Sequence, residues 1–295
     1  MTEFWQAVHR FPFLRQALLA GWMASLACGV VGSYVVSRRI TAVVGSLAHA
    51  VLGGMGVAYW LHTARGVSWL QPLHGALAAA VLAALLLGAV RYHAREREDT
   101  VISALWAVGI AVGVLFLSLS PGYKADLWTY LFGNLALIAP SDLVLLLVLD
   151  GLVLLVTALL YHPLLAVSYD EEFALLRGLN VPLYGTLLLV LVAVTIVSLV
   201  YVVGVVMVIA LVTLPVSAAG VFARRLWQMM LGGALLSGLV TTGGLALSYR
   251  ADLPTGAVTV LLAAAVYLLA HAARHAVTAR ARRGEGIAAH EEVEA

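Results

Sequence analysis

Long apolar runs separated by short polar segments make up most of this chain. The runs are continuous and rich in Leu, Ala and Val, and they lack the strict alternation of a membrane β-barrel, so they predict helices. A helix needs about 20 apolar residues to cross a bilayer. Nine segments meet that requirement: 16–36, 43–62, 72–91, 101–120, 140–161, 183–203, 204–222, 227–248 and 254–273.

The sixth and seventh of these segments form one uncharged stretch, 183–222, of 40 residues. Such a stretch must turn inside the membrane or at its edge, and Gly204 and Pro215 are the natural places for a break. If one member of the pair is only partly inserted, the number of spans falls to eight. The predicted fold class is therefore an all-α polytopic membrane protein with eight to nine spans.

The distribution of basic residues predicts the orientation in the membrane, because cytoplasmic loops carry an excess of Lys and Arg. With nine spans and the N-terminus outside, twelve of the 17 Lys and Arg residues lie inside and five lie outside. We therefore expect an N-out, C-in topology.

We expect one domain, a transmembrane body over residues 1–275, followed by a polar cytoplasmic tail over 276–295 that is disordered. Residues 121–139 mix aromatic and polar side chains. This segment predicts an interfacial or re-entrant piece on the outer side, with Trp128 and Tyr130 at headgroup level.

Composition excludes most other classes of protein. Hydrophobic residues make up 63% of the chain and charged residues 11%, against roughly 45–50% and 25% in soluble domains. The net charge of +2 gives no reason to expect nucleic acid, and the single Cys28 allows neither an internal disulfide nor a cysteine metal cluster. The sequence contains no P-loop, HExxH or GxSxG motif, so we expect a protein that is not an enzyme.

Two ionisable residues lie inside predicted spans, His49 in the second and Asp150 in the fifth. Ionisable groups at this depth are costly and mark functional sites by default. An imidazole and a carboxylate together suit zinc or manganese, so both residues are candidates for a metal pathway. The structural alternatives are a neutral His49 imidazole bonded to a backbone carbonyl and a protonated Asp150 bonded to a neighbouring helix.

Weaker candidates surround His49. His62 flanks the outer loop after the second span and could help to receive a cation. Gly45, Gly53 and Gly54 leave one side of the second span almost bare. A bare face can line a pore, or it can let two helices approach closely without any pore.

Six segments, in order over about 270 residues, resemble the permease subunits of ATP-binding-cassette importers for zinc, manganese and iron(II). Each segment is a weak signal alone, and the six in the correct order are a strong one. They are FLRQALLAG (13–21), RRITAVVGSLAHAVLGG (38–54), YLFGNLALIAPSDL (130–143), YDEEFALLRGLNV (169–181), VVGVVMVIALVTLPVSAA (202–219) and ADLPTGAVTVLLAA (251–264).

The resemblance implies that 169–181 is a short cytoplasmic coupling helix, which docks into a groove of the ATPase. Asp170, Glu171 and Glu172 would then lie in its first turn, where the helix dipole favours acids. Phe173 would be the apolar anchor and Gly178 the end of the helix.

The resemblance also implies that His49 is a transient metal ligand. Many members of the family carry an acidic residue four positions before this histidine, and here that position is Gly45. We therefore expect Asp150, from another span, to substitute for the missing acid.

The function predicted from these observations is that of the permease subunit of a bacterial plasma-membrane importer. It would move zinc, or else manganese, as a homodimer with a separate ATPase and an extracytoplasmic metal-binding protein. No permanently bound cofactor is expected. The alternatives are a secondary transporter driven by an ion gradient through Asp150, a permease of the same class for iron(II) or a chelate, and a membrane scaffold or intramembrane enzyme.

Overall fold

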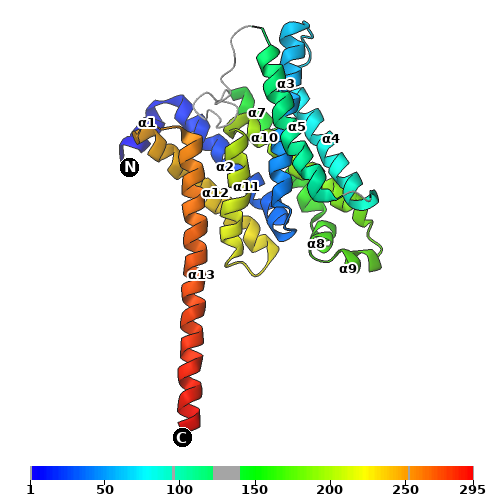
Figure 1. The fold of residues 1–295 in the computed structure, drawn as a ribbon. Coiled ribbons are helices and arrows are strands. Elements are labelled where there is room, and N and C mark those ends of the chain that lie inside the picture. The colour runs from blue at the N-terminus through cyan, green and yellow to red at the C-terminus, as the bar shows by residue number, and fades with distance from the viewer. Residues whose placement is uncertain (1, 95–96, 122–139, 252, 295) are drawn as a thin grey trace.

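The computed structural model describes residues 2–94, 97–121, 140–251 and 253–294, and within these ranges all regular structure is helical. The helices pack into one bundle from which the last helix projects (Figure 1). In chain order they are α1 (Thr2–Arg10), α2 (Pro12–Ser37), α3 (Thr41–Ala64), α4 (Pro72–His93), α5 (Glu98–Leu119), α7 (Pro140–Leu159), α8 (Tyr161–Tyr169), α9 (Glu171–Leu176), α10 (Val181–Val203), α11 (Val205–Gly220), α12 (Leu226–Ala251) and α13 (Thr255–Glu294).

Each of the nine predicted spans appears as a helix, but they are not equal in length. In the described part of the chain, eight helices are long and apolar enough to cross a membrane, namely α2, α3, α4, α5, α7, α10, α12 and α13. The ninth, α11, has only 16 residues. The lower end of the predicted range, eight, is therefore the number of full-length spans described.

The uncharged stretch breaks at Gly204, as the sequence predicts. Gly204 has φ +82° and ψ 162°, a backbone conformation that side chains other than hydrogen strongly disfavour. The second predicted break is wrong, because Pro215 lies inside α11 and does not end it. α11 packs against α2, α12 and α13, and neighbouring helices of this kind allow a membrane helix to tolerate a proline.

The core of the bundle lies where α2, α3, α10 and α11 meet, and their inward side chains are fully buried. α5, α7 and the first part of α13 expose long apolar side chains to the outside instead. This distribution is the one expected of outer helices that face lipid, because lipid imposes no cost on exposed Leu and Val.

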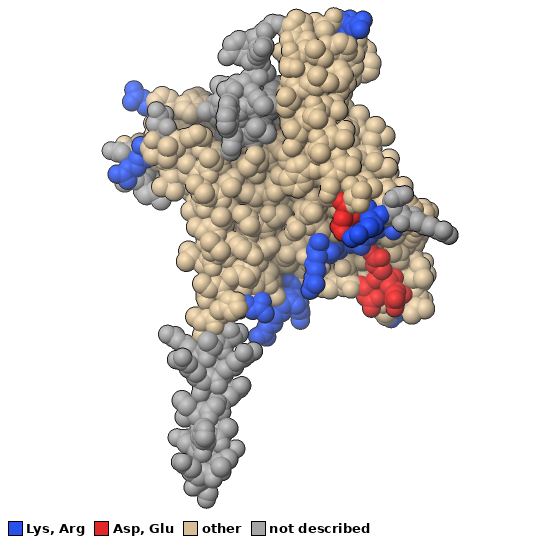
Figure 2. Space-filling view, in the orientation of Figure 1, with Lys and Arg blue, Asp and Glu red and all other residues tan. Residues whose placement is uncertain are grey.

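Two segments with charged residues come together at one end of the bundle. α9 and the turn between α11 and α12 lie there, and α13 projects from the same end (Figure 1). Figure 2 shows basic side chains along this end, next to an acidic patch. The clustering is what a positive-inside arrangement requires, and the N-out, C-in orientation stays a prediction.

The C-terminal helix α13 is described as one helix of 40 residues to Glu294. The disordered tail expected over 276–295 stays a prediction. The segment is rich in Ala, Arg and Glu, which are strong helix formers and favour continuation of the preceding span. The predicted interfacial piece with Trp128 and Tyr130 falls outside the described residues.

Candidate functional site

The short helix predicted within 169–181 is present as α9, and its two ends have clear local causes. Asp170 has an extended backbone, and its carboxylate accepts a hydrogen bond from the Phe173 amide at 2.9 Å, which caps the N-terminus. Glu171 and Glu172 occupy the first turn. Gly178 has φ +78°, the left-handed conformation in which glycine commonly terminates helices.

α9 has one face toward the protein and one toward the outside. Ala174 is buried against the end of α8 and the start of α10. Leu175 and Leu176 are exposed, Leu176 to 86%, and Phe173 is half exposed with the Arg177 guanidinium over its ring at 5.1 Å. Because soluble surfaces rarely present such neighbouring apolar side chains, this face has the character of a contact site.

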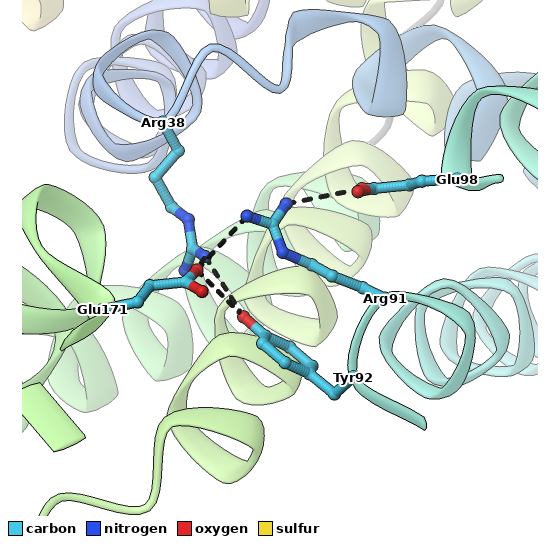
Figure 3. Close-up of polar contacts among 5 residues, drawn as sticks. All are labelled: Arg38, Arg91, Tyr92, Glu98 and Glu171. Carbon is cyan, nitrogen blue, oxygen red and sulfur yellow. Dashed lines mark hydrogen bonds and ion pairs between the residues drawn. The ribbon is translucent and has the colours of Figure 1, made fainter. Parts of the chain in front are cut away.

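The carboxylate of Glu171 points into the bundle and binds groups of its own chain (Figure 3). Arg38 pairs with its Oε1, and the Nη2 of Arg91 lies 3.2 Å from the same oxygen. Arg38 also donates a hydrogen bond to the Tyr92 hydroxyl at 3.1 Å, and that hydroxyl lies 3.4 Å from Glu171. Arg91 further pairs with Glu98 at 3.4 Å. Of the three acids expected to meet a partner, Glu171 is therefore the one that forms ion pairs within the described part of its own chain.

This network joins α9 to the membrane helices. Arg38 caps the C-terminus of α2 and lies directly before α3, Arg91 and Tyr92 end α4, and Glu98 begins α5. Bonds between ionised groups are roughly twice as strong as neutral ones. The Arg38–Glu171 pair therefore links α9 to the turn between α2 and α3.

His49 lies on α3, buried, with its ring held on two sides. Its Nδ1 lies 2.7 Å from the Gly45 carbonyl oxygen, which can only accept, so Nδ1 is the donor, and in the neutral imidazole Nε2 then carries the lone pair. The Trp106 ring on α5 stacks on the imidazole with centroids 4.9 Å apart and planes at 22°. The carbonyl bond is the one that the structural alternative predicts. It also leaves Nε2 available to a metal, because ligating histidines are commonly oriented this way.

Asp150 lies on α7 in a different neighbourhood. It is buried, and Ser198 on α10 donates a hydrogen bond to its Oδ1 at 2.6 Å, while Oδ2 has no hydrogen-bond partner among the described residues. The contacts of Asp150 with α10 and of His49 with α5 do not join the two residues into one site. Among the described residues no group of three or more His, Cys, Asp or Glu side chains could hold a metal.

The glycines of α3 pack closely against two other helices. A Cβ on Gly45 would lie 2.5 Å from Trp106, and a Cβ on Gly53 would lie 3.0 Å from the Gly109 carbonyl of α5. Gly54 contacts the backbone of Gly75 on α4. The glycine face of α3 therefore allows close approach of neighbouring helices, which is the second of the two alternatives given for it above.

A role of the same glycines in a pathway stays a prediction. Gly53 and Gly54 also line an apolar cavity of about 530 Å³ between α3, α4 and α5, and His74 lies at its wall. His62, near the end of α3, has a buried Nδ1 that forms no hydrogen bond within the part of the chain that the structure describes.

Sequence reasoning missed Trp106, Arg38 and Arg91 as partners of the candidate residues. Arg38 and Arg39 before α3 were noted in the sequence as part of the family resemblance, which did not indicate that Arg38 pairs with Glu171. Trp106 carried no signal, because a tryptophan in an apolar run is unremarkable.

Comparison with known proteins identifies the family of this chain. Residues 10–274 match the ABC 3 transport family (ABC-3). The chain belongs to this family. The ABC-3 chain is therefore a membrane subunit of a metal transport system rather than an enzyme, and a multi-pass protein of the bacterial plasma membrane.

Individual relatives agree over nearly the whole chain. A "Probable metal transport system membrane protein" of Chlamydia muridarum is 38% identical over 88% of this chain and 88% of its own. The manganese transport system membrane protein MntC of Halalkalibacterium halodurans is 30% identical, with 92% and 90% covered. Among solved structures, PsaBC from Streptococcus pneumoniae in complex with Fab superposes with a TM-score of 0.81 at 25% identity, covering 91% of this chain and 94% of the other.

Proposed function

We propose that this ABC-3 permease works as a homodimer with a separate ATPase, and that it imports zinc in preference to manganese. The observation that carries the proposal is α9. It combines an exposed apolar face with exposed acids, and its Glu171 is tied to the ends of α2 and α4. A helix built in this way can receive motion from a partner outside the membrane and pass it to the spans.

The mechanism follows from the contacts. An extracytoplasmic binding protein delivers the ion to the outer loops, and ATP binding closes the ATPase on the opposite side. The ATPase moves α9, Glu171 moves Arg38, and the turn at Arg38 moves α3, which carries His49. The ion passes His49 as a transient ligand, because a full cage of ligands would not release it.

The choice of zinc rests on the surroundings of His49. Imidazole nitrogen suits zinc, whereas manganese favours carboxylate and other oxygen ligands. The described contacts of His49 are to a carbonyl and an indole, and no carboxylate is among them. Relatives named for manganese favour that ion instead, and iron(II) is the third candidate, so the experiment must compare all three.

The test is uptake into proteoliposomes that contain this chain and its ATPase subunit, with the binding protein outside. Zinc, manganese and iron(II) are each measured with ATP and with a non-hydrolysable analogue. ATP-dependent zinc uptake that exceeds manganese uptake is the expected result. Uptake that needs no hydrolysis contradicts the importer, and a clear preference for manganese contradicts the choice of ion.

A secondary transporter is the second candidate, because Asp150 is a buried carboxyl group with one unpartnered oxygen. Such a group can carry a proton across a gradient. Liposomes that hold this chain alone would then accumulate metal under a proton gradient, and Asp150→Asn would abolish that accumulation. We expect no accumulation by the chain alone.

A further inference from the structure

Trp106 occupies the space directly beside His49. Its indole stacks on the imidazole, and it also fills the position that a side chain at residue 45 would take, since a Cβ there would lie 2.5 Å from its Cζ3. Residue 45 stands four positions before residue 49, so on a helix the two share one face. The indole therefore occupies the space beside the imidazole that a side chain at residue 45 would take.

The backbones of α3 and α5 approach closely beside this pair. One turn along α5, a Cβ on Gly109 would lie 2.5 Å from the His49 carbonyl oxygen, so the two helices cannot come closer there. At this separation the Trp106 ring lies against the imidazole, with 37% of the residue exposed.

We propose that Trp106 is a specificity-determining residue, which positions the His49 imidazole and keeps oxygen ligands away from it. This inference deepens the proposed metal transport and rests on it. The Gly45 carbonyl holds Nδ1, and the indole holds the ring plane, so Nε2 is the one nitrogen left for an ion. A site that offers nitrogen and excludes neighbouring carboxylate or water favours zinc over manganese.

The experiment measures the ratio of zinc to manganese affinity by equilibrium competition on the purified permease–ATPase complex without ATP. Trp106→Leu keeps an apolar side chain but removes the stacked ring, whereas Trp106→Phe keeps a ring. Loss of a group that orients a ligand typically costs about tenfold or more in affinity. We expect Trp106→Leu to lower the zinc-to-manganese ratio by about tenfold and Trp106→Phe to retain the wild-type ratio.

A matched control separates positioning from general packing. Phe116, also on α5, makes an edge-to-face contact with Trp60 on α3 at 5.3 Å. Phe116→Leu removes an aromatic contact between the same two helices and should leave the ratio unchanged. Gly45→Asp combined with Trp106→Leu places a carboxylate in the vacated space, and should turn the preference toward manganese.

The outcomes are distinguishable. An unchanged ratio in Trp106→Leu, or an equal change in Phe116→Leu, overturns the inference, as does an effect of Trp106→Leu that persists in a His49→Ala background. If the complex transports no metal but the ratio still depends on Trp106 and His49, the proposed function fails and the specificity role stands.

Discussion

Glu171→Gln removes the charge that holds α9 to the membrane helices while keeping the size of the side chain. In the wild type this carboxylate binds Arg38, Arg91 and the Tyr92 hydroxyl. Glu172→Gln is the matched control, because Glu172 lies beside it in the same helical turn and is exposed. Both variants remove one acid from α9, so only the network differs between them.

The magnitude follows from the exposure of the partners. The Arg38 side chain is 5% exposed and Glu171 is 39% exposed. Breaking a buried pair by removing one partner costs about 3–5 kcal/mol, and an exposed pair contributes about 0–1 kcal/mol. With one buried and one partly exposed partner, we expect a loss of about 2 kcal/mol in the free energy that holds α9 in place.

Hydrogen exchange of the α9 amides measures this quantity directly, because exchange reports the free energy of local opening. A loss of about 2 kcal/mol corresponds to exchange roughly 30-fold faster. We expect this increase for Glu171→Gln and little change for Glu172→Gln. In proteoliposomes with the ATPase, Glu171→Gln should also transport less metal for each ATP hydrolysed.

Equal exchange rates in the two variants would refute the reasoning, since the network would then contribute nothing to the position of α9. Faster exchange with unchanged transport per ATP would show that the Glu171 network holds α9 in place but has no role in coupling.

Other predictions address separate parts of the molecule. Phe173→Ala should reduce co-purification of the ATPase several-fold, because it removes apolar contact area. Trp69→Ala, in the exposed loop after α3, should not reduce it. Equal retention of the ATPase by both variants would show that α9 does not contact the ATPase. His49→Ala should abolish metal uptake while basal ATP hydrolysis and assembly persist. Normal uptake by this variant would show that His49 contributes only to packing. Gly54→Ala should destabilise the purified protein by about 2 kcal/mol or more through overpacking against α4, while Gly151→Ala, which meets no atom within 4 Å, should raise thermal stability slightly.

The spans and their approximate ends could be predicted from the sequence, because each depends on local properties, whereas the helix within 169–181 was expected from the family resemblance. Twenty apolar residues must form a helix in lipid, whatever the neighbouring segments do. Asp170 caps α9 and Gly178 ends it through bonds within the segment itself. The break at Gly204 is equally local. Pro215 was mispredicted as a break, since neighbouring helices allow α11 to continue through it.

The partners of the candidate residues were decided only by the tertiary structure. Arg38 and Glu171 are 133 positions apart, and no pattern in the sequence pairs them. Asp150 was expected to complete the surroundings of His49, yet its partner is Ser198, while His49 meets Trp106. Hydrophobicity determines that a helix enters the membrane, but nearly every face of these helices is apolar. The sequence therefore determined which segments cross and which short helix lies between them, and only the close packing at glycines decided which side chains meet inside.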